Sequence, residues 1–380
     1  MKRLLYDLQL SFINKATGKF MVEQDSNFNF CRGIEKNLNK NFQDTSMYVL
    51  TPARYQAEEF THLEFASEIP IEYNADVFAS RFTDFADMKQ LKDTIDWIKP
   101  DVIWTNDMTR VPAYKLFTDA KIIAYNHWID NRIMPKISED KTYVFRQAEG
   151  AWKSDLPLLN SQFGCNFFIS GLYDFIEGGE IIPQIRSKLY AIPPLVDIAN
   201  AVKSPKFERP TIMFNHRMSS LPYYKKNFDA FVTACEYLKK FCDFDVILTN
   251  PSGYALSELP KYMKVVTTNS YAEYLKVLSK CWLCVAAFFE SYGTWSMSVT
   301  DAILANTVVM LPNKFGYPEM VKPGYEYLCD NDAALQSKLR IFITYFDIAG
   351  AEKTAEENLK FAAENYSTKT KFEKLQAFLD

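Results

Sequence analysis

The sequence predicts an α/β protein made of two Rossmann-like domains and a helical C-terminal segment. Short β-branched or aromatic runs alternate with amphipathic stretches, which is the pattern of parallel α/β units. Apolar residues make up 48% and charged residues 24% of the 380 positions, as in an ordinary globular protein. At about 100–200 residues per domain, a chain of this length is expected to hold two domains, or three small ones.

Strands and helices are expected to alternate through both halves of the chain. Six strands are expected in the first half, at 3–10, 46–53, 101–106, 121–127, 155–161 and 188–194. Five are expected in the second half, at 211–216, 245–250, 264–269, 281–288 and 307–312, separated by helices such as 224–241 and 271–280. From about residue 331 the chain is expected to be helical, with Asn331 or Asp332 as the N-cap.

The two domains are expected to join near residues 195–210. This stretch, LVDIANAVKSPKFERP, is polar, contains two prolines and lacks hydrophobic periodicity. We therefore assign 1–195 to an N-terminal domain, 196–350 to a C-terminal domain, and 351–380 to helices that cross back to the N-terminal domain. In doubly wound domains of this kind, ligands bind at the carboxyl ends of the strands, here in the cleft between the domains.

Charge and apolar patterning exclude several classes of protein. The 43 basic and 47 acidic residues leave a net charge of −4, so no basic field covers the whole chain, although a local patch remains compatible with nucleic acid. The longest apolar run, CWLCVAAFF, is far shorter than the roughly 18–20 residues that span a bilayer, and no signal peptide is recognised. Seven scattered cysteines fit neither a disulfide scaffold nor a zinc ribbon. We expect a cytoplasmic protein without a membrane span.

Polar residues follow an expected strand in the second half of the chain. Glu290 ends this strand, Gly293 allows a tight turn, and Asp301 lies in the helix that begins near 296–298. A helix N-terminus at this place presents free N–H groups to an anion. The alternative is that Glu290 and Ser291 cap the helix and that Asp301 favours its dipole.

A second polar stretch, FNHRMSSLPYYKKNF, begins at residue 214. His216 and Arg217 end a strand there, and Lys225 and Lys226 open the following helix. The planar fork of an arginine and the point charge of a lysine together suit a diphosphate. The alternative is a solvated basic loop.

Four partial motifs occur in one order along the second half. They are IPPLVDI at 192–198, Arg217 with Lys226 and Asn227, ESYG at 290–293 followed by an acidic residue on the next helix, and PEMVKPGYEYL at 318–328. Together they resemble the donor half of GT-B glycosyltransferases of the glycogen-synthase-like retaining class. The order of elements resembles that class over essentially the whole chain, which implies the GT-B fold, with a cleft between two Rossmann-like domains.

The resemblance implies roles in binding a nucleotide-sugar donor. Arg217 and Lys226 would neutralise the leaving diphosphate, Glu290 would hydrogen-bond sugar hydroxyls, and Asp301 would accept a hydrogen bond from the nucleotide ribose. Backbone N–H groups around Tyr292 to Trp295 would complete the phosphate site. The other donor-binding residues implied are Ser291, Tyr292, Gly293, Thr294 and Glu319.

Two departures from the class pattern leave questions open. The second acidic residue stands eleven positions after Glu290 rather than eight, where the chain has Ser298, and it is an aspartate instead of a glutamate. The first domain also has FINKATGKFMVEQDSNFNF at 12–30, where the class has a glycine-rich loop. The ribose assignment and the stereochemical outcome, retaining or inverting, therefore stay open.

The first half supplies further candidates. His127 matches the place where these enzymes have a histidine that reaches the donor sugar, and the alternative is a hydrogen-bonded residue at a helix start. Asn106 and Asp107 end the preceding strand and are expected to line the cleft for the acceptor. Asp25 lies in the first loop, where inverting members of the wider fold place a catalytic carboxylate, and the alternative is that it caps a helix. The catalytic candidates are thus Asp25, His127 and Glu290.

No metal ion is expected to take part in catalysis. Asp243 and Asp245 form the Asp-x-Asp pair found in metal-dependent sugar transferases with another fold. The pair precedes an expected strand rather than ending one, which puts it away from the ligand-binding edge. We expect no cofactor besides the nucleotide-diphosphate sugar, which is a co-substrate.

The expected activity is transfer of a sugar from a nucleotide diphosphate to an acceptor hydroxyl. The chain has only 12 glycines but 30 Phe and 22 Tyr, a bias that AT-rich genomes, including many phage genomes, would encode. This bias and the missing glycine loop are similar to phage enzymes that glycosylate 5-hydroxymethylcytosine in double-stranded DNA, in the host cytoplasm. The alternatives are a glycosyltransferase of cell-surface polysaccharide, with a saccharide acceptor, and a non-catalytic sugar- or nucleotide-binding protein of the same fold.

Overall fold

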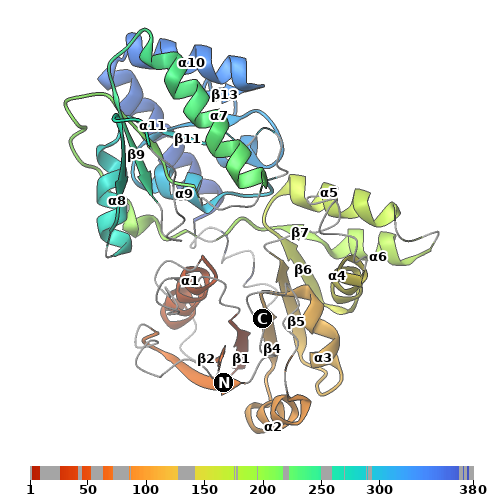
Figure 1. Cartoon of the computed structure of the whole chain (residues 1–380). Helices are drawn as coiled ribbons and strands as arrows, with labels where there is room; N and C mark the ends of the chain where they lie inside the picture. Colours follow the sequence, from red (N-terminus) through yellow and green to blue (C-terminus); the bar gives the residue numbers. More distant parts are fainter. Residues whose placement is uncertain are drawn as a thin grey trace. The chain divides into compact units, whose positions relative to one another are not determined.

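The computed structural model divides into two units, each built around a parallel sheet (Figure 1). The division falls between residues 195 and 196, and the second unit extends to Thr370, after which Lys371–Asp380 belong to the first. The expected segment 351–380 is thus divided at residue 370. The structure describes residues 2–8, 26–41, 45–52, 63–71, 85, 87–126, 142–174, 176, 179–194, 196–216, 222–249, 259–268, 270–287, 289, 293–367, 371 and 375, with the backbone alone at 26, 37, 39–41, 52, 142–143 and 222–226.

The first unit has a seven-stranded sheet in the order β3-β2-β1-β4-β5-β6-β7. Its strands are β1 (Lys2–Asp7), β2 (Thr45–Pro52), β3 (Ala66–Ile71), β4 (Val102–Thr105), β5 (Lys121–Asn126), β6 (Leu156–Leu159) and β7 (Tyr190–Ala191). Its helices are α1 (Ser26–Asn41), α2 (Met88–Ile98), η3 (Met108–Arg110), α3 (Val111–Lys115), α4 (Thr142–Lys153), α5 (Gln162–Tyr173) and α6 (Ile181–Lys188). The sequence reading missed β3, because Glu68 and Pro70 within it argue against a strand. Its position at the sheet edge tolerates both residues.

Helices cover both faces of this first sheet. Apolar residues of α2 to α6 pack with Leu5 and Ile103 on one face. On the other face, the ring of Phe30 from α1 lies 4.8 Å from that of Tyr125 and 5.7 Å from that of Trp104. Burial on both faces is the reason why these strands are continuously apolar in sequence.

The second unit has a six-stranded sheet in the order β10-β9-β8-β11-β12-β13. Its strands are β8 (Thr211–Phe214), β9 (Asp245–Thr249), β10 (Met263–Val266), β11 (Leu283–Val285), β12 (Val308–Pro312) and β13 (Leu328–Cys329). Its helical elements are η4 (Ile198–Asn200), α7 (Pro222–Lys239), α8 (Tyr271–Lys280), α9 (Met297–Leu304), η5 (Tyr317–Met320), α10 (Asp332–Thr344) and α11 (Ile348–Asn365). Its core also has two faces, with α8 and α9 packed on one and α7 and α10 on the other.

Local capping explains where several helices begin. The side chain of Asn331 accepts a hydrogen bond from the backbone N–H of Ala334, so α10 begins at Asp332, within the two positions expected for the cap. Ser270 accepts from the N–H of Glu273 at the start of α8 in the same way. Among the described helices, none combines the length and apolar character needed to cross a membrane.

Candidate functional site

The residues expected to form the donor site divide into two groups. Those that lie outside the described part of the chain are Asp25, His127, Arg217, Glu290, Ser291 and Tyr292. Lys226 lies in the second turn of α7, and only its backbone is described there. Those described with their side chains are Asn106, Asp107, Gly293, Thr294, Asp301 and Glu319. The geometry of the site is therefore built from this last group and its neighbours.

Asn215 follows β8 directly, at the carboxyl end of the second sheet, and is buried. Its Nδ2 atom donates to the hydroxyl of Tyr274 at 2.7 Å and to the carbonyl oxygen of Ser298 at 2.8 Å. Its Oδ1 atom accepts from the thiol of Cys284 in β11 at 3.0 Å. One side chain thus ties the end of β8 and the middle of β11 to α8 and to the first turn of α9. The sequence analysis did not identify Asn215.

Asp301 lies in the second turn of α9 and is bound by two phenols of α8. The hydroxyl of Tyr271 donates to Oδ1 at 2.6 Å, and that of Tyr274 donates to Oδ2 at 3.3 Å. Burial raises the pKa of Asp301 to about 6, although both hydrogen bonds act in the opposite direction. Both carboxylate oxygens, expected to face a ribose, therefore have partners inside the second unit. In the sequence, these two tyrosines are marked only by their spacing of three residues, which places them on one face of the helix.

The turn that leads into α9 is held by close backbone packing. The N–H of Gly316 donates to the carbonyl oxygen of Gly293 at 2.9 Å. A Cβ atom on Gly316 would lie 2.0 Å from the carbonyl oxygen of Thr294, so only glycine fits. The side chain of Ser296 then caps the helix by accepting from the N–H of Val299 at 3.4 Å. Gly293 and Thr294 thus have a defined backbone directly before the amino end of α9.

His216 is buried beside Phe214, with the two ring centroids 5.2 Å apart. Burial lowers the pKa of its imidazole to about 3, so the side chain is neutral at physiological pH. His216 therefore adds no positive charge next to Arg217. Glu319, expected in the donor site, lies in η5 and is half-buried, and its N–H donates to the carbonyl oxygen of Gly316 at 3.2 Å.

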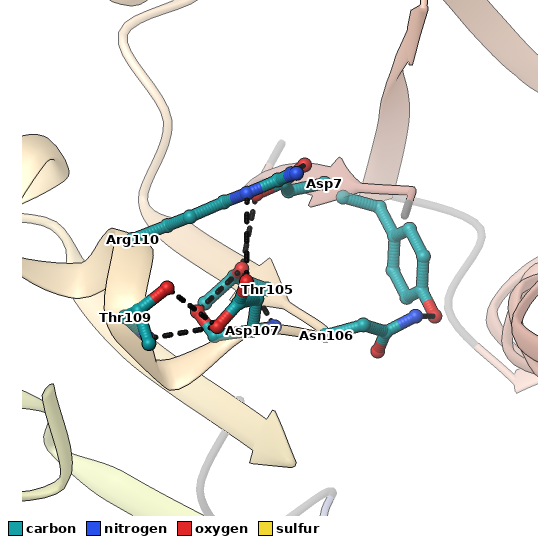
Figure 2. A network of polar contacts seen from close by, with 7 residues as sticks. Asp7, Thr105, Asn106, Asp107, Thr109 and Arg110 are labelled. Carbon is teal, nitrogen blue, oxygen red and sulfur yellow. Dashed lines mark hydrogen bonds and ion pairs between the residues drawn. The ribbon is translucent and has the colours of Figure 1, made fainter. Parts of the chain in front are cut away.

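A buried polar network lies at the carboxyl ends of β1 and β4 in the first unit (Figure 2). Asp7 ends β1, and its two oxygens accept from Nη1 of Arg110 at 2.5 Å and from Oγ1 of Thr105 at 3.0 Å. Asp107 accepts from the N–H and the hydroxyl of Thr109, at 2.9 and 2.7 Å, and so caps η3. This network comes from residues about a hundred positions apart that the parallel sheet brings together.

The two residues expected to face an acceptor belong to the same edge of the first sheet. Asn106 donates from Nδ2 to the hydroxyl of Tyr6 at 2.8 Å, and its Oδ1 atom is buried with no hydrogen-bond partner among the described residues. Burial raises the pKa of Asp107, while Arg110, whose Nε lies 4.0 Å from Oδ2 of Asp107, lowers it. Gly150 of α4 supports this turn, since a Cβ there would lie 1.8 Å from the carbonyl oxygen of Met108. Both side chains lie at the expected strand end, and both bind within their own unit.

The Asp-x-Asp pair forms surface salt bridges. Asp243 is exposed and pairs with Lys239 at 2.8 Å and with Arg209, while Asp245 lies 3.5 Å from Nη1 of Arg209. Hydrogen bonds to Lys239 and Arg209 lower the pKa of Asp243. Within the described part of the chain, no three His, Cys, Asp or Glu side chains gather as metal ligands.

Comparison with known proteins establishes the fold. No protein-family model matches the sequence, and no curated protein sequence does. Among solved structures, HepE of Anabaena in complex with UDP and glucose is similar over 100% of this chain and 99% of its own, with a TM-score of 0.68 and 13% identity. Sucrose-phosphate synthase of Thermosynechococcus elongatus is similar over the same shares, with a TM-score of 0.69 and 11% identity. TarM of S. aureus, in complex with fondaparinux, alpha-GlcNAc-glycerol and UDP, is similar over 99% of both chains, with a TM-score of 0.66 and 11% identity. The chain has the α/β GT-B fold, and this prediction is confirmed.

Proposed function

We propose that this protein is a glycosyltransferase that moves a sugar from a nucleoside diphosphate to an acceptor hydroxyl. The observation that carries the proposal is the similarity to HepE in complex with UDP and glucose, which extends over both units and essentially the full length of each chain. A fold alone does not define an activity. The ordered motifs around Arg217, Glu290 and Glu319 add independent support from the sequence.

The chemistry requires stabilisation of the charge that develops on the departing diphosphate. Arg217 and Lys226 are proposed to supply positive charge, and the amino end of α9 to supply N–H groups. The backbone at Gly293 and Thr294 leads directly to this end and is held by Gly316. Glu290 is proposed to bind the sugar hydroxyls.

The proposed donor is a uridine diphosphate sugar, because HepE and TarM were both determined with UDP. No metal or further cofactor is required by this scheme, since Arg217 and Lys226 serve the diphosphate. His127 is proposed to reach the donor sugar. Asp25 is proposed as the base if the configuration inverts, whereas in a retaining reaction the donor phosphate assists the incoming hydroxyl.

The proposed acceptor is a saccharide or another polyol bound by the first unit. Carboxylates of Asp7 and Asp107 stand at the carboxyl edge of its sheet, and Arg110, the cation that lies beside them among the described residues, is paired with Asp7. Residues 1–200 hold 22 basic and 27 acidic side chains, which disfavours a DNA backbone. No comparison supports the hydroxymethylcytosine acceptor or a phage origin.

Two measurements on the purified protein test the proposal: binding of nucleotide sugars, and transfer of the sugar to an acceptor. UDP-, GDP- and ADP-sugars are screened by thermal shift, since a ligand at 100 times its Kd adds about 2.7 kcal/mol of stability. The donor that binds is then incubated with saccharides and, in parallel, with hydroxymethylated duplex DNA. Transfer to a saccharide supports the proposal, transfer to DNA alone restores the phage-enzyme hypothesis, and binding without hydrolysis or transfer favours a non-catalytic binding protein.

A further inference from the structure

We propose that Asn215, Tyr274 and Asp301 form a positioning network that sets the first turn of α9 and thereby the affinity for the nucleotide diphosphate. This inference deepens the proposed function and rests on it. None of the three side chains has to touch the ligand, so all three are positioning residues. The hydrogen bonds that join them carry the proposal.

Asn215 connects the two arms of the proposed diphosphate site. It stands two residues before Arg217 in the chain, and its Nδ2 atom bonds the carbonyl oxygen of Ser298 in the first turn of α9. Both Nδ2 hydrogens have acceptors, and Oδ1 accepts from Cys284, so the amide plane has one orientation. A shift of Asn215 would move the end of β8 and the amino end of α9 relative to each other.

Asp301 determines the orientation of the Tyr274 hydroxyl, which in turn orients Asn215. As a carboxylate, Asp301 accepts from both phenols, and Tyr274 then offers its oxygen to Asn215. A protonated Asp301 must donate one hydrogen bond, which reverses or removes one of these links. Asp301 therefore accepts from both phenols only when it is ionised.

Few titratable groups of the described residues share this environment. Among those residues, the groups that face Asp301 are Tyr271 and Tyr274 from α8 and Cys284 from β11. Burial raises the pKa of Tyr274 well above its ordinary value and that of Cys284 likewise, so both stay neutral. Of the described side chains on α11 and β12, which also pack on α9, none shifts the pKa of Asp301. Among these described groups, Asp301 is thus the one that titrates, near pH 6.

The experiment measures UDP affinity of the full chain and of Asp301→Asn and Tyr274→Phe, from about pH 5 to about pH 8. An asparagine at 301 keeps the shape and stands for the protonated state. Taking the ratio of mutant to wild-type Kd at each pH cancels the titration of the UDP phosphate. The ratio for Asp301→Asn is expected to be about three- to tenfold at the upper end, the effect of about one hydrogen bond, and to approach one at the lower end.

Tyr325→Phe is the matched control. Tyr325 is a buried tyrosine of the same unit whose hydroxyl donates to the carbonyl oxygen of Val309 at 2.7 Å and accepts from its N–H at 3.2 Å, so its loss also removes buried hydrogen bonds, none of which involves the network residues. UDP affinity of this variant is expected to equal that of the wild type. Amide hydrogen exchange at residues 297–300 is expected to be faster in Asp301→Asn and Tyr274→Phe than in Tyr325→Phe.

The outcomes separate this inference from the proposed function. Suppose that UDP binds but the ratio of mutant to wild-type Kd is one at every pH, or that amide hydrogen exchange at residues 297–300 is equal in all variants. Either result overturns the inference and leaves the proposed function standing. Failure of the wild type to bind UDP, GDP or ADP overturns the proposed function. Hydrogen exchange needs no ligand, so it decides the positioning claim in that case as well.

Discussion

The two units place buried carboxylates at the same kind of edge but neutralise them differently. In the first unit, Asp7 at the end of β1 pairs with the guanidinium of Arg110, whose side chain is also fully buried. In the second unit, Asp301 has two neutral phenols as partners and no cation among the described residues around it. The first arrangement compensates the charge, whereas the second leaves it to hydrogen bonds alone.

The difference indicates separate roles for the Asp7–Arg110 pair and for Asp301. A paired buried charge is costly to break, because removing one partner leaves the other uncompensated. A carboxylate held by phenols alone titrates near pH 6, since burial is only partly offset by hydrogen bonds. We therefore expect the Asp7–Arg110 pair to contribute to stability, and the hydrogen bonds of Asp301 to respond to pH.

The largest effect is expected from Arg110→Met. This variant leaves the Asp7 carboxylate buried without its cation, which costs about 3–5 kcal/mol. Denaturant unfolding measures the loss. The double variant Asp7→Asn with Arg110→Met is the control, and it is expected to recover part of the stability because neither charge remains. Equal stability of Arg110→Met and wild type would show that the pair contributes nothing and would remove the contrast between the two edges.

The next effect is a pH dependence of stability that comes from Asp301. Burial raises its pKa to about 6, above the about 3.9 of an unfolded chain, so the folded state binds the proton more tightly. The stabilisation of the folded state by protonated Asp301 is fully present below about pH 4. It is lost as the pH rises through about 6, and the loss is at most about 3 kcal/mol. The unfolding free energy of the wild type, minus that of Asp301→Asn, is expected to fall over this range. Parallel pH curves for the two proteins would contradict the titration.

Together with the positioning network, this prediction describes an opposition between stability and binding. The fold is more stable with Asp301 protonated, yet the chain of hydrogen bonds through Tyr274 and Asn215 is complete when Asp301 is ionised. A buried carboxylate with no cation among its described neighbours departs from the usual pairing of buried charges, and such departures are typical of sites under functional constraint. The first unit shows that the same architecture can avoid it with one arginine.

A smaller effect is expected from the cations assigned to the donor. Arg217→Ala and Lys226→Ala should each lower turnover about tenfold to a hundredfold, because each removes a charge-assisted contact that strengthens as the diphosphate leaves. The melting temperature is expected to change little, in contrast to Arg110→Met. Arg209→Ala is the matched control, since Arg209 is half-exposed and pairs with Asp243 on the surface. Full activity of either donor variant would remove the assignment of the diphosphate site.

The sequence allowed the layered fold to be predicted because buried parallel strands are apolar runs with turn residues between them. The cap at Asn331 was predictable for the same local reason. β3 was not, because its glutamate and proline suit an edge position that only the tertiary structure defines. Local patterns therefore reveal elements that are buried on both faces better than elements at an edge.

For Asn106 and Asp107 the sequence indicated the strand end at which they lie, but not their partners. Asn106 and Asp107 lie at the strand end that the pattern indicated, yet the hydroxyl bound by Asn106 belongs to Tyr6, 100 positions earlier. Asn215 bonds Ser298 across 83 positions, and no periodicity connects them. The choice of partner depends on which strands become neighbours, so a single sequence leaves it undetermined.

The smallest effect is expected from removing divalent cations, which should leave turnover unchanged. Ligands bind at the carboxyl ends of parallel strands, whereas Asp243 and Asp245 stand where β9 begins and pair with Lys239 and Arg209. Activity is measured with and without EDTA, and in the double variant Asp243→Asn with Asp245→Asn. Turnover is expected to be equal in all three cases, because the diphosphate charge is met by Arg217 and Lys226. Loss on chelation that magnesium or manganese restores would show a metal in the reaction. If the double variant loses the same activity, the metal binds to Asp243 and Asp245 at the amino edge of the second sheet. The comparison of carboxylates in the two units would then have to include this pair.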